Sequence, residues 1–220
     1  HGQVVEITEK LLQYEKWFTE QKVLTASKVG WPQTRKRHFL CAHKEKAGFD
    51  NYLTLEQAEE VFSHPTRPVS WVLEDLLGLK GQTTFDKPSE ISEENKERIR
   101  ILYEEMEGEY NLPDKYGPLS RQIKENTHKS VYGRMRADKP SGTITTGFLS
   151  IGRGRFMHPI EPRSLTPHDG ARIQGFPDSY QFEIGEKPPL RTHLSKWIGD
   201  AVPIPLGYTA GLAAISRFLG

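Results

Sequence analysis

The stretch that decides the fold is RSLTPHDGARIQGFPDSY, which occupies residues 163–180. Thr166 can cap a helix, Pro167 suits the first helical position, and the carboxylate of Asp169 can bond back to the cap. Gly175 can adopt the left-handed backbone that ends many helices. The stretch therefore predicts a short helix, capped at both ends and followed by a Gly-Phe-Pro turn.

Two further segments complete the pattern, one near each end of the chain. PQTRKR spans residues 32–37, and GDAVPIPL spans residues 199–206. Arg35 and Arg37 alternate, so in an extended segment both side chains project to the same side. Two guanidiniums on one face form a rigid fork for phosphate oxygens or a base carbonyl, but basic turns are also common as solvated surface.

The three segments, in this order, resemble the last three conserved blocks of the DNA cytosine-5 methyltransferase family. The family's RSLTPxxxARxQGFPDxY block is the most specific of them, and it is matched here by Arg163, Leu165, Thr166, Ala171, Arg172, Gln174, Gly175, Phe176, Pro177, Asp178 and Tyr180. The third block usually carries Asn where this chain has Asp200, a change that removes two donors and adds a negative charge. The sequence has neither the Pro-Cys dipeptide nor the Gly-rich strand-to-helix turn of the preceding blocks.

The resemblance implies the C-terminal part of a Rossmann-like, S-adenosylmethionine-dependent methyltransferase domain with an inserted target-recognition domain. Its fold class is α/β, and the isolated piece would be a mixed α+β structure. Residues 1–43 and 160–220 would belong to the catalytic domain, and residues 44–159 would form the target-recognition domain. Hydrophobic residues make up only 35% of the chain, which indicates long polar loops or a core completed by another polypeptide.

The implied activity is that of a DNA (cytosine-5-)-methyltransferase, which moves a methyl group from S-adenosylmethionine to C5 of a cytosine flipped out of duplex DNA. Without the family's nucleophilic Cys block, the chain alone is predicted to be inactive. It would need a catalytic N-terminal half, in a longer chain or in a separate subunit.

Two alternatives stay open. The chain could be a non-catalytic DNA-binding module derived from the family, or an RNA cytosine-5 methyltransferase. The large inserted segment favours a reader of duplex DNA, because such a reader needs surface for the major groove.

The resemblance also assigns expected site residues. Three match the catalytic positions that hold the flipped nucleotide and stabilise charge on its ring: Gln33, Arg35 and Arg37. Three match the turn beside S-adenosylmethionine: Asp200, Ala201 and Val202. Arginines in or next to the insert are the expected DNA contacts: Arg134, Arg136, Arg153, Arg155 and Arg163.

Charge is unevenly distributed, although the formal net charge is only +1. Residues 86–114 hold ten acidic and four basic side chains, whereas residues 121–155 hold eight Lys or Arg against two acidic ones. This asymmetry indicates one face turned toward phosphate and another turned away from it.

The single cysteine, Cys41, lies in the apolar run HFLCA without a preceding Pro. A buried thiol has a raised pKa and is unreactive, so Cys41 is predicted to be a core residue rather than a substitute nucleophile. One cysteine excludes a disulfide framework and favours a cytoplasmic location, nucleoid-associated if the source is bacterial. The eight His show no metal-ligand spacing, and no apolar run approaches the ~20 residues of a membrane helix.

Hydrophobic periodicity and capping signals predict the secondary structure. The predicted helices occupy residues 4–18, 54–62, 69–77, 92–106 and 206–219. The predicted strands lie around Val23 and at residues 38–42, with a strand-like piece at residues 143–146 inside the loop-rich region 111–160. Residues 4–18 and 206–219 would lack family partners for their apolar faces, so we expect an exposed apolar patch or self-association there.

Overall fold

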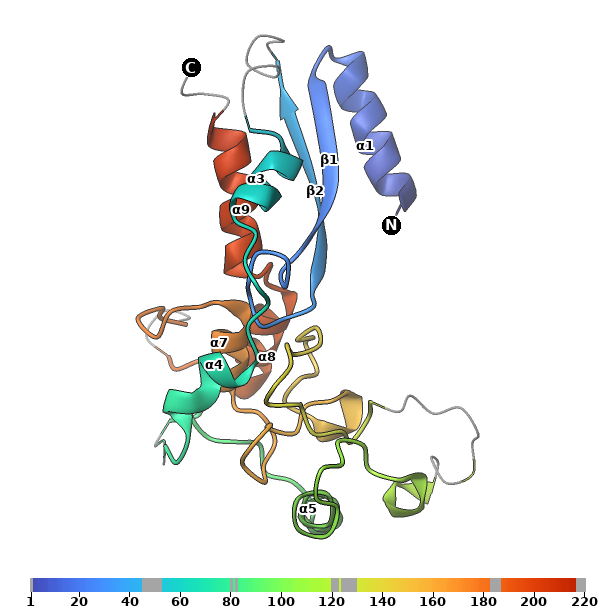
Figure 1. Ribbon diagram of the computed structural model, residues 1–220, viewed down its shortest axis with the longest axis vertical. Helices are drawn as coiled ribbons and strands as arrows, with labels where there is room; N and C mark the ends of the chain where they lie inside the picture. The colour runs from blue at the N-terminus through green and yellow to red at the C-terminus, as the bar shows by residue number, and fades with distance from the viewer. Residues whose placement is uncertain are drawn as a thin grey trace. The chain divides into compact units, whose positions relative to one another are not determined.

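The computed structural model describes residues 2–44, 53–79, 81, 83–119, 123, 130–182 and 187–216. The chain forms two compact units (Figure 1). Unit 1 comprises His1–Thr66 and Val202–Gly220, and unit 2 comprises Arg67–Ala201. The units are defined by compactness, whereas the predicted domains are defined by the family's sequence blocks. The predicted boundaries near residues 44 and 159 therefore stay a prediction.

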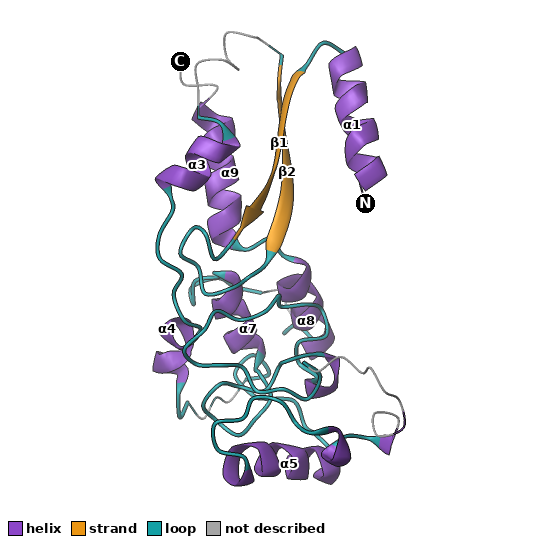
Figure 2. Cartoon of the chain, turned by 45° about the vertical axis from the view of Figure 1, so that its right-hand side comes forward, coloured by secondary structure: helices purple, strands orange, loops and turns teal. Residues whose placement is uncertain are grey.

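Unit 1 is built on an antiparallel hairpin of β1 (Phe18–Thr25) and β2 (Lys36–His43). Helices α3 (Leu55–Val61) and α9 (Ile204–Ser216) lie on one side of this hairpin, and α1 (Gly2–Tyr14) lies beside it on the other side (Figures 1 and 2). The core of unit 1 joins β1, α3 and α9 through side chains that include Leu24, Leu55, Leu206 and Ala213.

The predicted strands and helices of unit 1 are confirmed, with different ends. The first helix stops at Tyr14 rather than at residue 18, because Lys16 turns into the left-handed backbone at φ 62° and β1 begins at Phe18. The helix predicted over residues 54–62 begins as expected, with Thr54 and Gln57 forming a capping box. The last helix begins at Ile204, and residues 217–219 of its predicted range lie outside the described residues.

Unit 2 is mostly loop, with short helices that hold the loops in place (Figure 2). These elements are α4 (Ser70–Leu73), η1 (Glu74–Leu76), α5 (Glu93–Arg100), the π-helical turn η2 (Ile101–Glu105), η3 (Asp114–Tyr116), η4 (Ile151–Arg153), α7 (Pro167–Gln174) and α8 (Arg191–Asp200). Isolated bridges of Met157 with Arg134 and Ser164 tie the loop region to the start of the 163–180 block.

One prediction for unit 2 is wrong, because residues 143–146 form a loop rather than a strand-like piece. The helix predicted over residues 92–106 is observed as α5 and η2, with Ser92 as the N-cap residue. Its apolar side chains belong to the core of unit 2, because Ile99 and Leu102 are buried and Met106 packs against the same cluster.

The described residues combine helices with one two-stranded sheet, so the prediction of a mixed fold is confirmed. No single helix in the described part of the chain is long and apolar enough to cross a membrane, and α8 and α9 reach such a length only as a broken pair.

Candidate nucleic-acid interface

The 163–180 block forms the predicted capped helix, α7. Thr166 Oγ1 accepts from the backbone N–H of Asp169 at 3.0 Å, and Asp169 Oδ2 accepts from the backbone N–H of Thr166 at 2.7 Å. Gly175 ends the helix at φ 91°, in the left-handed region. These reciprocal bonds satisfy donors that the first helical turn cannot use itself.

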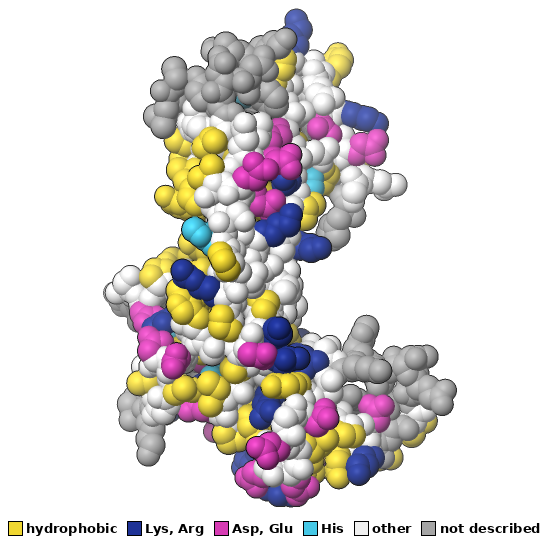
Figure 3. Space-filling view, in the orientation of Figure 1, with side chains coloured by type: hydrophobic (Ala, Val, Ile, Leu, Met, Phe, Trp, Pro, Cys, Tyr) yellow, Lys and Arg dark blue, Asp and Glu magenta, His cyan; other side chains and the backbone are white. Residues whose placement is uncertain are grey.

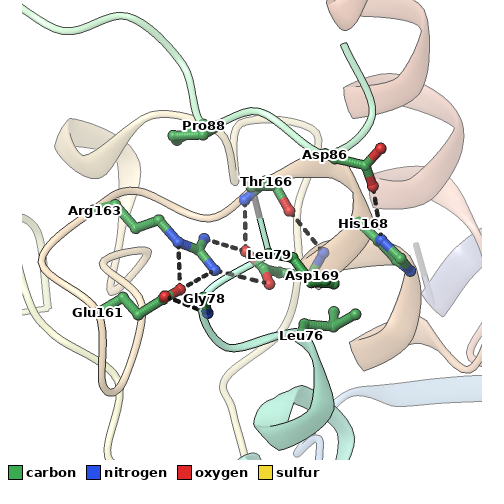
Figure 4. A pocket seen from close by; sticks show the side chains of 10 residues that line it. All are labelled: Leu76, Gly78, Leu79, Asp86, Pro88, Glu161, Arg163, Thr166, His168 and Asp169. Carbon is green, nitrogen blue, oxygen red and sulfur yellow. Dashed lines mark hydrogen bonds and ion pairs between the residues drawn. The ribbon is translucent and has the colours of Figure 1, made fainter. Parts of the chain in front are cut away.

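A partly buried ion-pair network lies beside the cap (Figure 4). Arg163 donates to the carboxylates of Asp169 and Glu161, and the Asp169 side chain is only 1% exposed. Burial alone would lower the pKa of Arg163, but the two carboxylates outweigh it and raise that pKa. Arg163 therefore has a structural role, which is to neutralise these two carboxylates. It also lines a cavity of about 230 Å³. Its contact with DNA stays a prediction.

A second network ties the same helix to η1. Arg172 donates to both carboxylate oxygens of Asp75, at 3.1 and 3.0 Å, and also to Asp178. The bonds from Arg172, with one from His168, lower the pKa of Asp178 to about 2. Most of the residues that match the family block therefore organise the protein itself, as their sequence pattern indicates.

Two glycines let the loop of residues 141–149 pack closely against α7 and α8. A Cβ atom on Gly170 of α7 would lie 2.3 Å from the ring of Phe148. A Cβ atom on Gly199 of α8 would lie 2.4 Å from the backbone nitrogen of Thr146. Ser195 also donates to the carbonyl of Thr146. The loop of residues 141–149 is thus held directly against the helix that ends in the GDAVP turn.

This loop forms one wall of a basic cleft of about 600 Å³ within unit 2. Its lining includes Arg136, Lys139, Ser141, Thr143, Arg153 and Arg155. Figure 3 shows several basic side chains on the visible face of unit 2, with acidic ones among them and over α5. A concave surface of guanidiniums, an ammonium and hydroxyls is chemistry that suits a phosphodiester strand.

Of the four arginines predicted inside the insert, three line this cleft, and Arg134 does not. The guanidinium of Arg134 stacks over the rings of Tyr103 and Tyr110, at 4.9 and 5.1 Å from their centroids. Arg155 donates to the carbonyls of Tyr110 and Arg134. Burial, and then the charge of Arg136, lower the pKa of Arg155. Arg134 and Arg155 therefore support the cleft from within the protein.

The predicted nucleotide-holding residues belong to unit 1. Gln33 is fully buried, Arg35 is 2% exposed, and Arg37 is half-buried in β2. The backbone carbonyl of Arg35 accepts from the N–H of Ala26 at 3.0 Å. A side chain as buried as that of Arg35 is not part of a solvated basic turn, so that interpretation is wrong for this residue.

The predicted cofactor turn lies at the end of α8. Gln174 donates to the carbonyls of Ile198 and Ala201, which joins the turn to α7. A pocket of about 520 Å³ opens beside it, and is lined by Phe176, Tyr180, Gln181, Phe182, Trp197, Asp200 and Ala201. Aromatic faces together with a carboxylate suit a cationic ligand. Val202, the third predicted residue, belongs to unit 1.

Sequence reasoning missed the aromatic wall of this pocket. The ring centroids of Phe182 and Trp197 lie 6.5 Å apart, and the two rings are nearly parallel. The ring centroids of Phe182 and Tyr180 lie 4.8 Å apart. Trp197, just before the GDAVP turn, was an available signal, because Trp is enriched at binding interfaces.

Cys41 lies in the middle of β2, opposite Glu20, and packs half-buried against the core cluster of unit 1. No group of His, Cys, Asp and Glu among the described residues could hold a metal ion.

Comparison with known proteins supplies the class of the molecule. A family model described as C-5 cytosine-specific DNA methylase matches residues 1–215. The chain therefore belongs to the C-5 cytosine-specific DNA methylase family. Its resemblance to that family, first indicated by three sequence blocks, is confirmed.

Individual relatives agree. The type II methyltransferase M1.BsuMI of Bacillus subtilis is 40% identical over 201 residues, which are 91% of this chain and 44% of that protein. DNA (cytosine-5)-methyltransferase 2 of Arabidopsis thaliana is 30% identical over 66% of this chain and 10% of its own length. The crystal structure of the S. pombe Dnmt2 methyltransferase has a TM-score of 0.61 at 13% identity, and the match covers 97% of this chain and 62% of that one. This chain thus spans less than half the length of these two curated relatives.

Proposed function

We propose that this chain is the target-recognition and C-terminal part of a DNA (cytosine-5-)-methyltransferase, and that it acts on duplex DNA. One observation supports the proposal: the loop that lines the basic cleft packs directly against α7 and α8, and both helices contain residues of the family blocks. Gly199, from the GDAVP block, touches the backbone of the loop that lines the cleft. DNA held in the cleft would therefore lie close to the C-terminal end of α8.

The proposed division of labour follows from the residue types. Gln33, Arg35 and Arg37 would hold the flipped cytosine, because guanidinium donors stabilise negative charge that develops on the ring when a thiolate adds to C6. We propose that the thiolate comes from a polypeptide segment outside this chain. The absence of a Pro before Cys41, and its half-buried position in a β-hairpin, support this source.

S-adenosylmethionine would supply the methyl group, and its cationic sulfonium fits the chemistry of the pocket beside Asp200. The carboxylate of Asp200 and the rings of Tyr180, Phe182 and Trp197 would favour a positive charge in that pocket. Asp200 would then strengthen binding of the cofactor, because a carboxylate attracts a cation more strongly than the amide of the family's usual Asn.

A competition experiment tests the choice of nucleic acid. The purified chain would be given labelled duplex DNA with unlabelled structured RNA as competitor, at several stated salt concentrations. We expect duplex DNA to win, with affinity falling steeply as salt rises because phosphate contacts release counterions. Preference for RNA at every salt concentration would support the RNA methyltransferase instead.

The non-catalytic module is distinguished by its genetic neighbourhood. A Pro-Cys-Gln block upstream in the same reading frame, or in an adjacent one, supports the enzyme. Its absence from both places supports a module that only binds DNA.

A further inference from the structure

Arg153 stands between two clefts of unit 2. It lines the basic cleft, and it also lines a second cleft of about 630 Å³ whose walls include Ser92, Asn95 and Ser195. The neighbouring residues divide between the two: Thr145 faces the basic cleft, whereas Thr146 and Gly147 face the second one. The segment of residues 145–153 is therefore a ridge with a hollow on either side.

The side chain of Arg153 is supported along its stem. A Cβ atom on Gly147 would lie 2.5 Å from Cδ of Arg153 and 3.3 Å from its Cβ, so the stem passes directly over the glycine. The ridge itself is anchored, because Phe148 is fully buried and Ile151 is 2% exposed. A supported stem loses less rotamer freedom when the guanidinium binds a ligand.

The guanidinium of Arg153 also differs from its neighbours in what it already binds. Within the part of the chain that the structure describes, it makes no hydrogen bond or ion pair. Arg155 donates to Tyr110, Arg134 and Asn111, and Arg136 is paired with Asp138 at 2.9 Å. No described residue therefore occupies any of the five donors of the Arg153 guanidinium, which project from an exposed ridge.

We propose that Arg153 is a specificity-determining residue, which reads a guanine through the O6 and N7 acceptors that this base presents in the major groove. The inference rests on the proposed function. We expect the ridge to enter the major groove, with one phosphate backbone of the DNA in each of the two clefts beside it. The ammonium of Lys139 and the hydroxyl of Thr143 line the basic cleft, where a backbone would lie. They can serve its phosphates and leave the planar fork of Arg153 for a base edge.

The test is selection of duplexes from a randomised library by the full chain, followed by affinity measurements on the selected site. The original protein should select a site with a guanine at one position or more. Arg153→Gln should lose discrimination at one such position, roughly 10- to 100-fold, and leave the other positions unchanged. Gly147→Ala should weaken discrimination at the same position, because it displaces the stem of Arg153.

Arg153→Lys and Arg100→Gln serve as controls. Lysine keeps the charge without the bidentate fork, so Arg153→Lys should lose most of the discrimination and keep its slope of affinity against salt. Arg100 is a half-buried residue paired with Glu97 and Glu105 and does not line either cleft, and Arg100→Gln should retain full discrimination.

Two outcomes would overturn the inference. Arg153→Gln could weaken binding equally for all sequences and reduce the salt slope by about one, which is the signature of a phosphate contact. It could also leave selection unchanged. Failure of the original protein to bind any duplex would count against the proposed function instead.

Discussion

The fully buried His158 makes the stability of the protein depend on pH. Its Nδ1 accepts from the backbone N–H groups of Ile160 and Glu161, at 3.2 and 2.9 Å, so the proton of the neutral ring is on Nε2. Burial lowers the pKa of His158 from 6.5 to about 4. Between these two pH values the unfolded chain binds a proton that the folded chain does not, so stability is lost as pH falls through this window.

We therefore predict that the free energy of unfolding falls by on the order of 3 kcal/mol between pH 7 and pH 4 through this residue. His158→Asn keeps an acceptor for the two backbone donors and removes the titration. Urea unfolding at a series of pH values should show that the free energy of unfolding falls less between pH 7 and pH 4 in the variant than in the original protein. Identical pH profiles for the two proteins would rule this out.

Arg163 can be tested as a structural residue against its predicted role as a DNA contact. Arg163→Met leaves the carboxylate of Asp169 buried without its guanidinium partner. We expect a loss of stability of about 3–5 kcal/mol, measured by denaturant unfolding. Glu161→Gln should cost much less, because Glu161 is the more exposed partner of Arg163. A stable Arg163→Met protein with weakened DNA binding would instead support the DNA contact.

At the level of elements, the contact between α8 and the loop of residues 141–149 has no room for a methyl group. In Gly199→Ala the added Cβ would meet backbone atoms of Thr145 and Thr146 at 2.4–2.5 Å. We expect a loss of about 1–3 kcal/mol of stability and weaker DNA binding, because the displaced loop lines the basic cleft.

Gly207→Ala in α9 is the matched control. A Cβ atom at Gly207 meets nothing within 4 Å among the described residues, so this variant should gain up to about 1 kcal/mol from helix propensity. Thermal unfolding of both variants decides the matter. Equal stability of the Gly199→Ala variant and the original protein would show that the loop adapts at no cost.

Helix α1 carries the exposed apolar patch that the sequence predicts. No residue of α1, all of which the structure describes, is buried. Val4, Ile7, Leu11 and Tyr14 recur at helical spacing and are 58–83% exposed. An apolar stripe of this kind is typical of an interface.

We predict that α1 docks the catalytic N-terminal half. Replacing Ile7 and Leu11 with Lys should abolish co-purification with that half and leave unfolding and DNA binding unchanged. Lys10→Glu, which alters charge outside the stripe, should co-purify normally. The prediction fails if the double Lys variant co-purifies as well as the original protein.

Sequence predicted the elements well where a few neighbouring residues decide them. The capping boxes at Thr54 and Thr166 and the stop at Gly175 follow from bonds within one helical turn, and all are observed. The strand-like piece at residues 143–146 was wrong for the opposite reason. Its backbone is fixed by Gly199 and Ser195, about fifty residues away, and no local pattern contains that contact.

For the whole molecule, the sequence blocks predicted the family, and the family model confirms it. Most of the site's geometry was beyond prediction. The pocket beside Asp200 needs the rings of Trp197 and Phe182 to come together, and the availability of Arg153 depends on which neighbouring arginines are already paired. Such properties come from long-range packing, which residue types and spacing do not encode locally.

The central proposal is that these residues read the DNA and grip the base, whereas the nucleophile comes from another segment. Its most direct test is transfer of a radiolabelled methyl group from S-adenosylmethionine to duplex DNA. We predict no incorporation by this chain alone. We expect incorporation once a polypeptide with the family's Pro-Cys block is co-expressed, with or without Cys41→Ser. Incorporation by the purified chain alone, abolished by Cys41→Ser, would contradict it.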